Sequence, residues 1–313
     1  MLINSIYFKS STFLFYFFFA GYIMSPKVLA SNDTAHITTF LQDTNFKLGK
    51  TYTNGFENVA DFASFYITPQ NHRGSSGHDL VTDIIHSGNR AHKAWMYGVN
   101  DVIANINTNH RAYPTFQMDN TELGIIKSKV LVDFWVWLDV DLYEEEHKNW
   151  LSLATFTSYA DSSWIRSYLV NVDNNYRIHL MHVPQQGQSL QNIYQNQTTQ
   201  IPKKQWVNIS IFIDYTTDNR FNSPFIGAWQ DSELVAASTF NDRIDPYSIP
   251  PEQHPQCLQG WDQQDLTDAE QRCGLNYTGG LAQLHLGLYA PPLLSAGTIY
   301  NDGLRIFEIL RTD

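Results

Sequence analysis

Hydrophobic and polar residues alternate in short stretches along the chain, and this alternation predicts β-strands. Every odd position of residues 207–213 is Val or Ile, and every even position of residues 284–288 is Leu. A period of two places consecutive side chains on opposite faces of a sheet. Both segments are therefore expected to be strands with one buried face and one face that is available for chemistry.

Other segments are rich in β-branched and aromatic residues, and clusters of Asn, Asp, Gly and Pro separate them. This composition predicts strands that are joined by turns. The further strands are expected at residues 89–97, 129–138, 164–172, 176–183, 225–230, 234–238 and 298–309. Helical periodicity is confined to residues 101–107 and 265–272. Many strands with few helices favour an all-β fold, a two-sheet antiparallel β-sandwich of the jelly-roll type with a few short helices.

The first 30 residues predict a signal peptide. The apolar run at residues 13–23 is too short for a comfortable membrane span, and it follows Lys9. Val28 and Ala30 occupy the positions that signal peptidases favour, so cleavage is expected after Ala30. We therefore expect a secreted or periplasmic protein that has no membrane contact after cleavage. An uncleaved membrane anchor is the alternative.

Residues 31–313 are expected to form one domain, because no linker or fixed-period repeat interrupts them. Hydrophobic residues make up 43% of the chain, which allows a large core. The net charge is −11, and it becomes −13 once the signal peptide and its two lysines are removed, with 18 Lys and Arg against 31 Asp and Glu. This balance argues against a nucleic-acid binder, because no excess of cations is present to displace counterions from phosphates. We expect a monomer.

The chain has two cysteines, Cys257 and Cys273. In an oxidising compartment they most simply form one disulfide, which would pin a long excursion at residues 244–280. Two free thiols are the alternative. Two cysteines alone cannot form a zinc site.

Four expected strands carry Arg, His, Tyr or Trp on one face, where a solvated face would carry Lys, Glu, Thr and Ser. Arg offers a two-pronged donor to a carboxylate, and Tyr and His can transfer protons. A single such residue is more often an ordinary surface group, but the recurrence on four strands indicates a groove. The residues that share faces are His86, Gly88, Arg90 and His92; Trp164, Arg166 and Tyr168; Arg177 and His179; and Gln283, His285, Gly287 and Tyr289.

Short motifs of the chain resemble those of the jelly-roll polysaccharide lyases. This group includes alginate, glucuronan and heparin-lyase-like enzymes within the concanavalin A-like lectin and glucanase fold. The resemblance covers most of residues 81–308. The motifs lie at residues 90–93 (RAHK), 177–179 (RIH), 229–235 (WQDSELV), 284–289 (LHLGLY) and 297–302 (GTIYND).

The resemblance implies β-elimination on a uronate-containing acidic polysaccharide, with no required cofactor. Arg90 and His92 would bind or neutralise the carboxylate, and His179 and Tyr289 would be base and acid in an order that the sequence leaves open. The chain departs from the alginate-lyase pattern, because His92, Arg177 and His285 replace a Glu, a Gln and a Lys. The implied substrate-binding residues are His86, Lys93, Arg166, Tyr168, Arg177, Gln283 and His285.

Two other functions compete with the lyase. A glycoside hydrolase of the same fold needs paired carboxylates on one strand. The nearest candidate is residues 139–144. They continue into a charged segment that is typical of a solvated turn after a strand. A lectin-like module would bind sugars without cleaving them. A structural Ca²⁺ could use oxygen atoms of Asp231, Asn301 and Asp302, which could equally be turn residues.

Overall fold

A computed structural model gives the structure of the chain. It describes residues 46–62, 65–66, 72–73, 75–100, 109–118, 121–126, 128–158, 167–182, 191–216, 225–239 and 280–311. The expected signal peptide, both expected helices, Arg166, both cysteines and nearly all of the expected excursion at 244–280 lie outside these residues. No helix of the described residues is long and apolar enough to cross a membrane.

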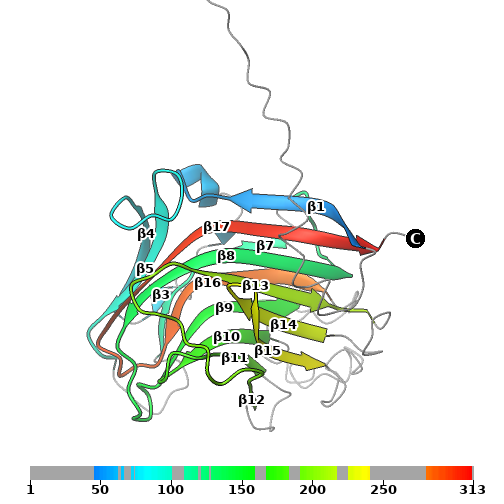
Figure 1. Cartoon of the computed structure of the whole chain (residues 1–313). Helices are drawn as coiled ribbons and strands as arrows, with labels where there is room; N and C mark the ends of the chain where they lie inside the picture. The colour runs from blue at the N-terminus through cyan, green and yellow to red at the C-terminus, as the bar shows by residue number, and fades with distance from the viewer. Residues whose placement is uncertain are drawn as a thin grey trace, which may run out of the picture. The chain divides into compact units, whose positions relative to one another are not determined.

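The first sheet, which we call sheet A, is an antiparallel sheet of eight strands (Figure 1). Its strand order is β15-β14-β13-β8-β17-β5-β4, and β1 also pairs with β17. The strands are β1 (Phe46–Asn54), β4 (Ser76–Val81), β5 (Ala91–Tyr97), β8 (Lys129–Val140), β13 (Val207–Asp214), β14 (Phe225–Gln230), β15 (Glu233–Thr239) and β17 (Ala296–Arg311).

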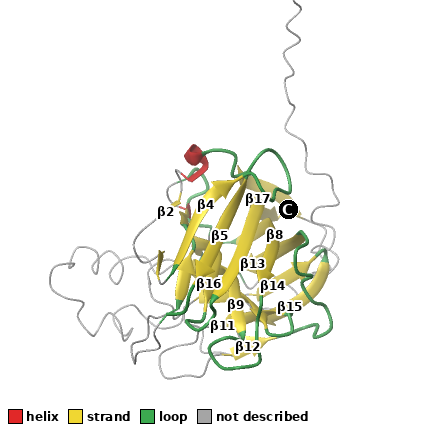
Figure 2. Cartoon of the chain, turned by 90° about the vertical axis from the view of Figure 1, so that its left-hand side faces the viewer, coloured by secondary structure: helices red, strands yellow, loops and turns green. Residues whose placement is uncertain are grey.

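The second sheet, sheet B, is an antiparallel sheet of nine strands in the order β12-β11-β10-β9-β16-β6-β3, with β7 pairing β16 and β2. Strands dominate the described chain, and η1 (Val59–Phe62) is one turn of 3-10 helix (Figure 2). The strands are β2 (Phe65–Tyr66), β3 (His72–Arg73), β6 (His110–Ala112), β7 (Thr115–Gln117), β9 (Trp150–Ser158), β10 (Ser167–Asp173), β11 (Ile178–His182), β12 (Gln191–Ile193) and β16 (Leu281–Ala290).

One large hydrophobic core lies between the two sheets, and alternate residues of both sheets build it. The odd positions of β13 from Val207 to Ile213 and the even positions of β16 from Leu284 to Leu288 all belong to this core. The predicted alternation and the predicted antiparallel β-sandwich are therefore confirmed. The other face of each sheet, turned away from the core, is called its outer face below.

One predicted strand begins later than expected. Residues 82–90 form an irregular loop between β4 and β5, so His86, Gly88 and Arg90 do not share a strand face with His92. Side chains accept hydrogen bonds from the backbone N–H groups of this loop. Asp302 accepts those of His86 and Ser87 at 3.0 and 2.8 Å. Because these donors are bonded to a carboxylate, they are not available to a strand ladder.

Candidate active site

A row of side chains crosses five neighbouring strands of sheet B. The register aligns Arg111 of β6 with Tyr289 of β16, Tyr289 with Ser152 of β9, Ser152 with Asn171 of β10, and Asn171 with His179 of β11. Each of them has a neighbour along its strand that belongs to the core between the sheets. The five side chains therefore lie together on the outer face of sheet B, and we call them the outer row.

Arg111 and Tyr289 form the first end of the outer row. The Arg111 guanidinium carbon lies 5.5 Å from the centre of the Tyr289 ring, and both residues are buried. Asn109 donates a hydrogen bond from Nδ2 to the Tyr289 hydroxyl at 2.8 Å. Burial raises the pKa of Tyr289, although Asn109 and the positive charge of Arg111 oppose that rise. The phenol is therefore protonated at neutral pH and can act as a proton donor.

His285 lies four residues before Tyr289 on the same face of β16. Its ring stacks on Tyr113 with 5.0 Å between the ring centres, and Tyr113 meets the Tyr289 ring edge-on at 5.9 Å. Trp150 contacts the other side of Tyr289 at 5.1 Å. Burial and then the charge of Arg111 lower the pKa of His285 to about 4. The imidazole is therefore neutral at neutral pH and can accept a proton.

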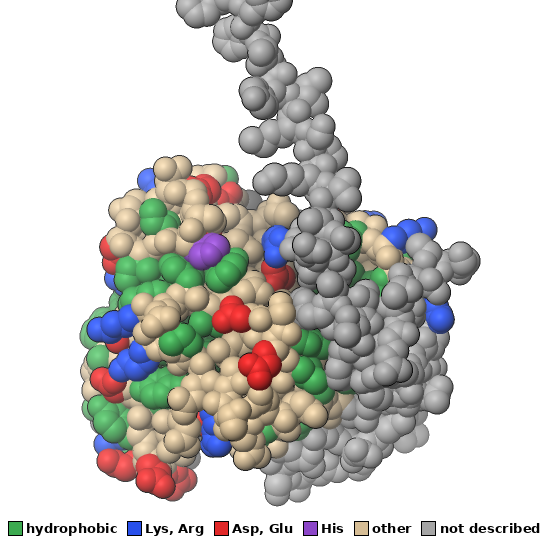
Figure 3. Space-filling model, in the orientation of Figure 1, with side chains coloured by type: hydrophobic (Ala, Val, Ile, Leu, Met, Phe, Trp, Pro, Cys, Tyr) green, Lys and Arg blue, Asp and Glu red, His purple; other side chains and the backbone are tan. Residues whose placement is uncertain are grey.

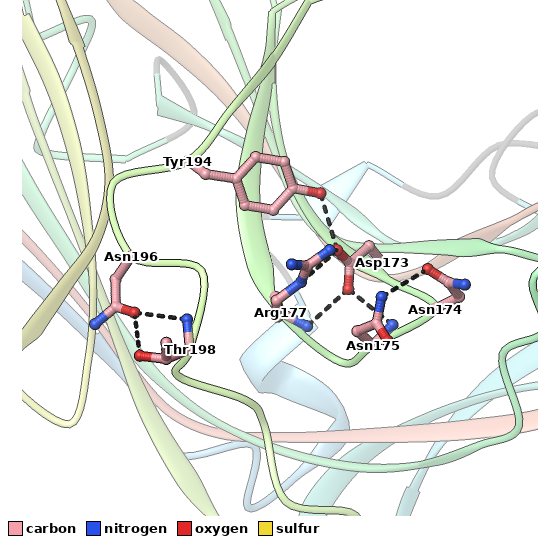
Figure 4. Close-up of polar contacts among 7 residues, drawn as sticks. All are labelled: Asp173, Asn174, Asn175, Arg177, Tyr194, Asn196 and Thr198. Atoms are coloured by element: carbon pink, nitrogen blue, oxygen red, sulfur yellow. Dashed lines mark hydrogen bonds and ion pairs between the residues drawn. The ribbon is translucent and has the colours of Figure 1, made fainter.

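His179 lies at the other end of the outer row, beside a second group of residues. The His179 ring stacks on Tyr194 with 4.8 Å between ring centres. Tyr194 donates its hydroxyl hydrogen to Asp173 at 3.0 Å, and Arg177 donates to the same carboxylate oxygen from Nε at 2.8 Å and from Nη2 at 2.6 Å (Figure 4). We call Asp173, Arg177, His179 and Tyr194 the Asp173 cluster.

The charges of the Asp173 cluster balance internally. Burial would raise the pKa of Asp173, but hydrogen bonds from Arg177, Tyr194 and backbone N–H groups outweigh it and lower that pKa. Burial lowers the pKa of His179 to about 4, against the attraction of Asp173. Arg177, which the sequence placed in the substrate groove, is held by Asp173 and lies 5.3 Å from the Tyr194 ring centre. It acts here as the counter-ion of Asp173.

The two ends of the outer row are well separated across the sheet. Three strand steps separate Tyr289 from His179, and each step is about 4.8 Å, so their backbones lie about 14 Å apart. His285 lies about 13 Å from Tyr289 along β16, four residues at about 3.3 Å each. The Tyr113 ring contacts the rings of both His285 and Tyr289, and it links His285 to the Arg111 and Tyr289 end.

The other expected site residues lie elsewhere. Arg90 is exposed in the β4–β5 loop, and the His92 ring faces the core, 5.2 Å from His78. Lys93 bonds Asp83 at 3.3 Å on sheet A. The structure does not bring Arg90 and His92 together with His179 and Tyr289.

Two further expected groove residues belong to sheet B, and only one of them is on its outer face. Tyr168 is buried in the core, because the alternation of β10 turns it toward sheet A. Gln283 lies on the outer face with His285 and Tyr289, and donates to Gln117 at 3.2 Å. The expected shared face of β16 is therefore confirmed.

Arg111 was not among the residues singled out from the sequence. Its strand, β6, has three residues and is followed by Tyr113 and Pro114, so no alternation marks it. Asn171 and Ser152 were also missed, because a lone polar residue in a strand carries no chemical signature. Only the pairing of strands distant in the sequence places these three residues beside Tyr289 and His179.

No group of three or more His, Cys, Asp or Glu side chains that could hold a metal is found among the described residues. Asp231 accepts the backbone N–H of Asn208 at 2.9 Å, and Asp302 accepts two backbone N–H groups of the β4–β5 loop. A structural Ca²⁺ at these residues stays a prediction.

The buried histidines predict that the fold loses stability in mild acid. The unfolded chain takes up protons below the ordinary histidine pKa of 6.5, whereas His179 and His285 resist protonation down to about pH 4. His92 adds to this loss of stability in acid, because burial lowers its pKa well below the ordinary value. Between about pH 7 and pH 5 we expect the free energy of unfolding to fall by about 2 kcal/mol for each of His179 and His285.

Denaturant unfolding at both pH values measures this loss. His179→Gln should remove its share of the pH dependence. An unfolding free energy that does not change over this range would contradict the burial of neutral histidines.

The Asp173 cluster predicts a second stability effect. Asp173→Ala leaves Arg177 and Tyr194 without their acceptor and removes the bonds to the backbone N–H groups of Asn175 and Arg177. We expect the free energy of unfolding to fall by about 2 to 3 kcal/mol. The matched control is Glu145→Ala, which breaks an exposed pair with Lys148 and should cost less than about 0.5 kcal/mol. Equal effects of the two substitutions in chemical denaturation would contradict the structural role of Asp173.

No family model and no curated protein matches the sequence. Among solved structures, "Cellulose induced protein, Cip1" is similar with 11% identity and a TM-score of 0.50, over 82% of this chain and 96% of that chain. The endo-beta-1,4-glucuronan lyase from the fungus Trichoderma reesei is similar with 9% identity and a TM-score of 0.50, over 82% and 94%. At these identities the similarity shows the fold: the chain shares its jelly-roll sandwich with these two proteins, as the motifs implied.

Proposed function

We propose that this protein is a secreted lyase that cleaves a uronate-containing polysaccharide by β-elimination. The observation that carries the proposal is the pairing of Arg111 with Tyr289 on the outer face of sheet B, with His285 on the same face and joined to Tyr289 through the Tyr113 ring. Arg111, Tyr289 and His285 are a cation, a protonated phenol and a neutral imidazole, supplied by β6 and β16. The fold shared with a glucuronan lyase is compatible with this chemistry.

Each of the three groups has a role in the reaction. The Arg111 guanidinium pairs with the uronate carboxylate and stabilises the negative charge that develops when the neighbouring C5–H bond breaks. His285 accepts the C5 proton at its imidazole, and Tyr289 donates its hydroxyl proton to the leaving O4 atom. The C4–O bond breaks and a C4–C5 double bond forms, so no water is consumed.

A hydrolase fits this face less well. Hydrolysis by a glycosidase uses two carboxyl groups that flank the scissile bond. Among the strand residues that the structure describes on the outer face of sheet B, Asp173 is the one carboxylate. Its oxygens accept hydrogen bonds from Arg177 and Tyr194, so it is a structural anion in the folded protein.

The far end of the outer row is suited to holding the polymer. Asn171 and His179 are buried, and within the described part of the chain neither Asn171 Oδ1 nor His179 Nδ1 has a hydrogen-bond partner. The outer row spans four strand steps, or about 19 Å. We therefore assign His179 and Asn171 to a distant subsite that binds sugar hydroxyls, and we expect cleavage within long chains.

The distant subsite gives a kinetic prediction. His179→Ala removes binding that is equal in the ground state and the transition state, so KM for the polymer should rise about tenfold while kcat changes less than about threefold. Steady-state kinetics on polymer substrates measures both constants. The contrast is His285→Ala, for which kcat should fall by at least about a hundredfold. A collapse of kcat in His179→Ala would place His179 in the chemistry and contradict the assignment.

The proposal is tested with a panel of glucuronan, alginate, hyaluronan, heparin-type and pectic polymers. A lyase produces an unsaturated uronate at each new non-reducing end, which absorbs ultraviolet light. We expect this absorbance to rise with at least one polymer. Binding to a polymer without any product would instead identify a lectin-like module and refute the lyase.

A further inference from the structure

A pocket of about 480 Å³ lies at the outer face of sheet A, away from the outer row of sheet B. The end of β1, the β4–β5 loop, β8 and β17 line it, with Asn54, His86, Trp135, Gly303 and Arg305 among its residues. Trp135 and Arg305 lie on the outer face because their strand neighbours belong to the core. Pockets of this size, lined mainly by apolar and aromatic groups with a few polar ones, are typical of small-ligand sites.

Aromatic rings form one wall of the pocket. The His86 ring stacks on Trp135 with 3.8 Å between the ring centres and 18° between the planes. Trp206 meets the His86 ring edge-on at 5.6 Å. His86 itself is exposed, so the stack ends in a ring that faces solvent. Figure 3 shows hydrophobic side chains gathered beside a histidine on the side of the molecule that it draws.

The backbone around the pocket is fixed before any ligand arrives. The buried Asp302 carboxylate holds the N–H groups of His86 and Ser87, and Glu57 holds that of Asn89 at 2.9 Å. Gly303 has a φ of 57°, and a Cβ atom there would lie 3.4 Å from Trp135. These features keep the loop and the Trp135 ring in place, which lowers the entropic cost of binding.

The charges at the pocket are compensated. Asp133 accepts a hydrogen bond from Arg305 Nε at 2.9 Å, and it also accepts one from Asn208 at 2.8 Å. The Asp302 carboxylate is buried beneath the loop. The cation of Arg305 is thus matched by an adjacent anion, so the pocket offers no excess positive charge to a uronate. Its aromatic wall suits the apolar face of a sugar ring, and its polar rim suits hydroxyl groups.

We propose that this pocket is a second carbohydrate site, which binds an uncharged pyranose unit of a polysaccharide. It lies on the opposite outer face from Arg111 and Tyr289, so it would hold the protein on a neutral polymer without occupying the outer row. The proposal does not depend on the lyase activity, because binding at His86 and Trp135 requires nothing of sheet B.

Calorimetric titration of the full chain with cellohexaose and mannohexaose tests the proposal. We expect saturable binding of at least one of these neutral oligosaccharides, and weaker binding of a glucuronate hexasaccharide by the same pocket. His86→Ala and Trp135→Ala should each weaken the neutral ligand about tenfold. Because His86 is an exposed loop residue, its variant keeps the test valid even where Trp135→Ala fails to fold.

Two matched variants separate this site from the rest of the protein. Trp137→Ala changes a tryptophan of the same strand and face that packs on Tyr300 outside the pocket, and it should leave binding unchanged. Tyr289→Phe should also leave binding unchanged, whatever it does to cleavage. The proposal is overturned by no saturable binding of either neutral hexasaccharide, by full affinity in His86→Ala, or by an equal loss in Trp137→Ala.

Discussion

Arg111→Ala is expected to lower kcat/KM on the uronate polymer by about a thousandfold. The guanidinium is the one cation paired in register with Tyr289 on the described outer face of sheet B. Without it, the carboxylate of the substrate would repel the charge that develops as the C5 proton leaves. Initial rates of unsaturated-uronate formation measure the effect, and a thermal melt of the variant establishes that it is folded.

Arg111→Lys is the matched control for this prediction. Lysine keeps the positive charge but lacks the planar fork that binds both oxygens of a carboxylate. We therefore expect an intermediate loss, about ten- to a hundredfold. A folded Arg111→Ala protein that cleaves at the rate of the parent protein would remove Arg111 from the mechanism.

Tyr289→Phe is expected to lower kcat by about a thousandfold with little change in KM, because the ring remains while the donor to the leaving oxygen is lost. Its packing against Tyr113 and Trp150 uses ring faces and edges that phenylalanine retains. Steady-state kinetics on the polymer separates the two constants. The hydroxyl also accepts from Asn109, so a melt should accompany the kinetics.

Tyr113→Phe controls for the loss of a neighbouring hydroxyl. Tyr113 stacks on His285 through its ring, so its variant should retain most of kcat. Should the two variants lose activity equally, the effect would belong to the environment of the site and the donor role of Tyr289 would fail.

The fold could be predicted from the sequence because a two-residue repeat of hydrophobic positions shows which side chains of a strand share one face of the sheet. Val207 to Ile213 and Leu284 to Leu288 were expected to be buried, and they form part of the core. The same period correctly placed His285 and Tyr289 together on the opposite face. Along a single strand, the sequence pattern and the structure therefore agree.

The candidate site was harder to predict, because it depends on pairing between strands and on local bonds. Extending the alternation backward from His92 implied a strand through His86 and Arg90. Instead, Asp302 and Glu57 accept hydrogen bonds from backbone N–H groups of this segment, which is a loop. For His92 itself, the adjacent Ala91 and Lys93 include no large apolar side chain that would mark the buried face. Arg111 comes from a three-residue strand whose partner, Tyr289, lies far along the chain.

The register across sheet B also changes the roles that we propose for two histidines. A motif assigned His179 to proton transfer, yet three strand steps separate it from Tyr289. His285 lies on the strand of Tyr289 and has a pKa of about 4. We therefore propose His285 as the neutral base and His179 as a residue that binds the polymer.

Cleavage in water enriched in heavy oxygen tests the central claim most directly. A β-elimination breaks the C4–O bond without consuming water, so mass spectrometry should find no heavy oxygen introduced by cleavage and a product one water lighter than a hydrolysis product. Heavy-oxygen exchange at the reducing end is corrected with a product standard kept in the same water. One heavy oxygen gained per bond cleaved would show hydrolysis and contradict the roles given to Arg111, His285 and Tyr289.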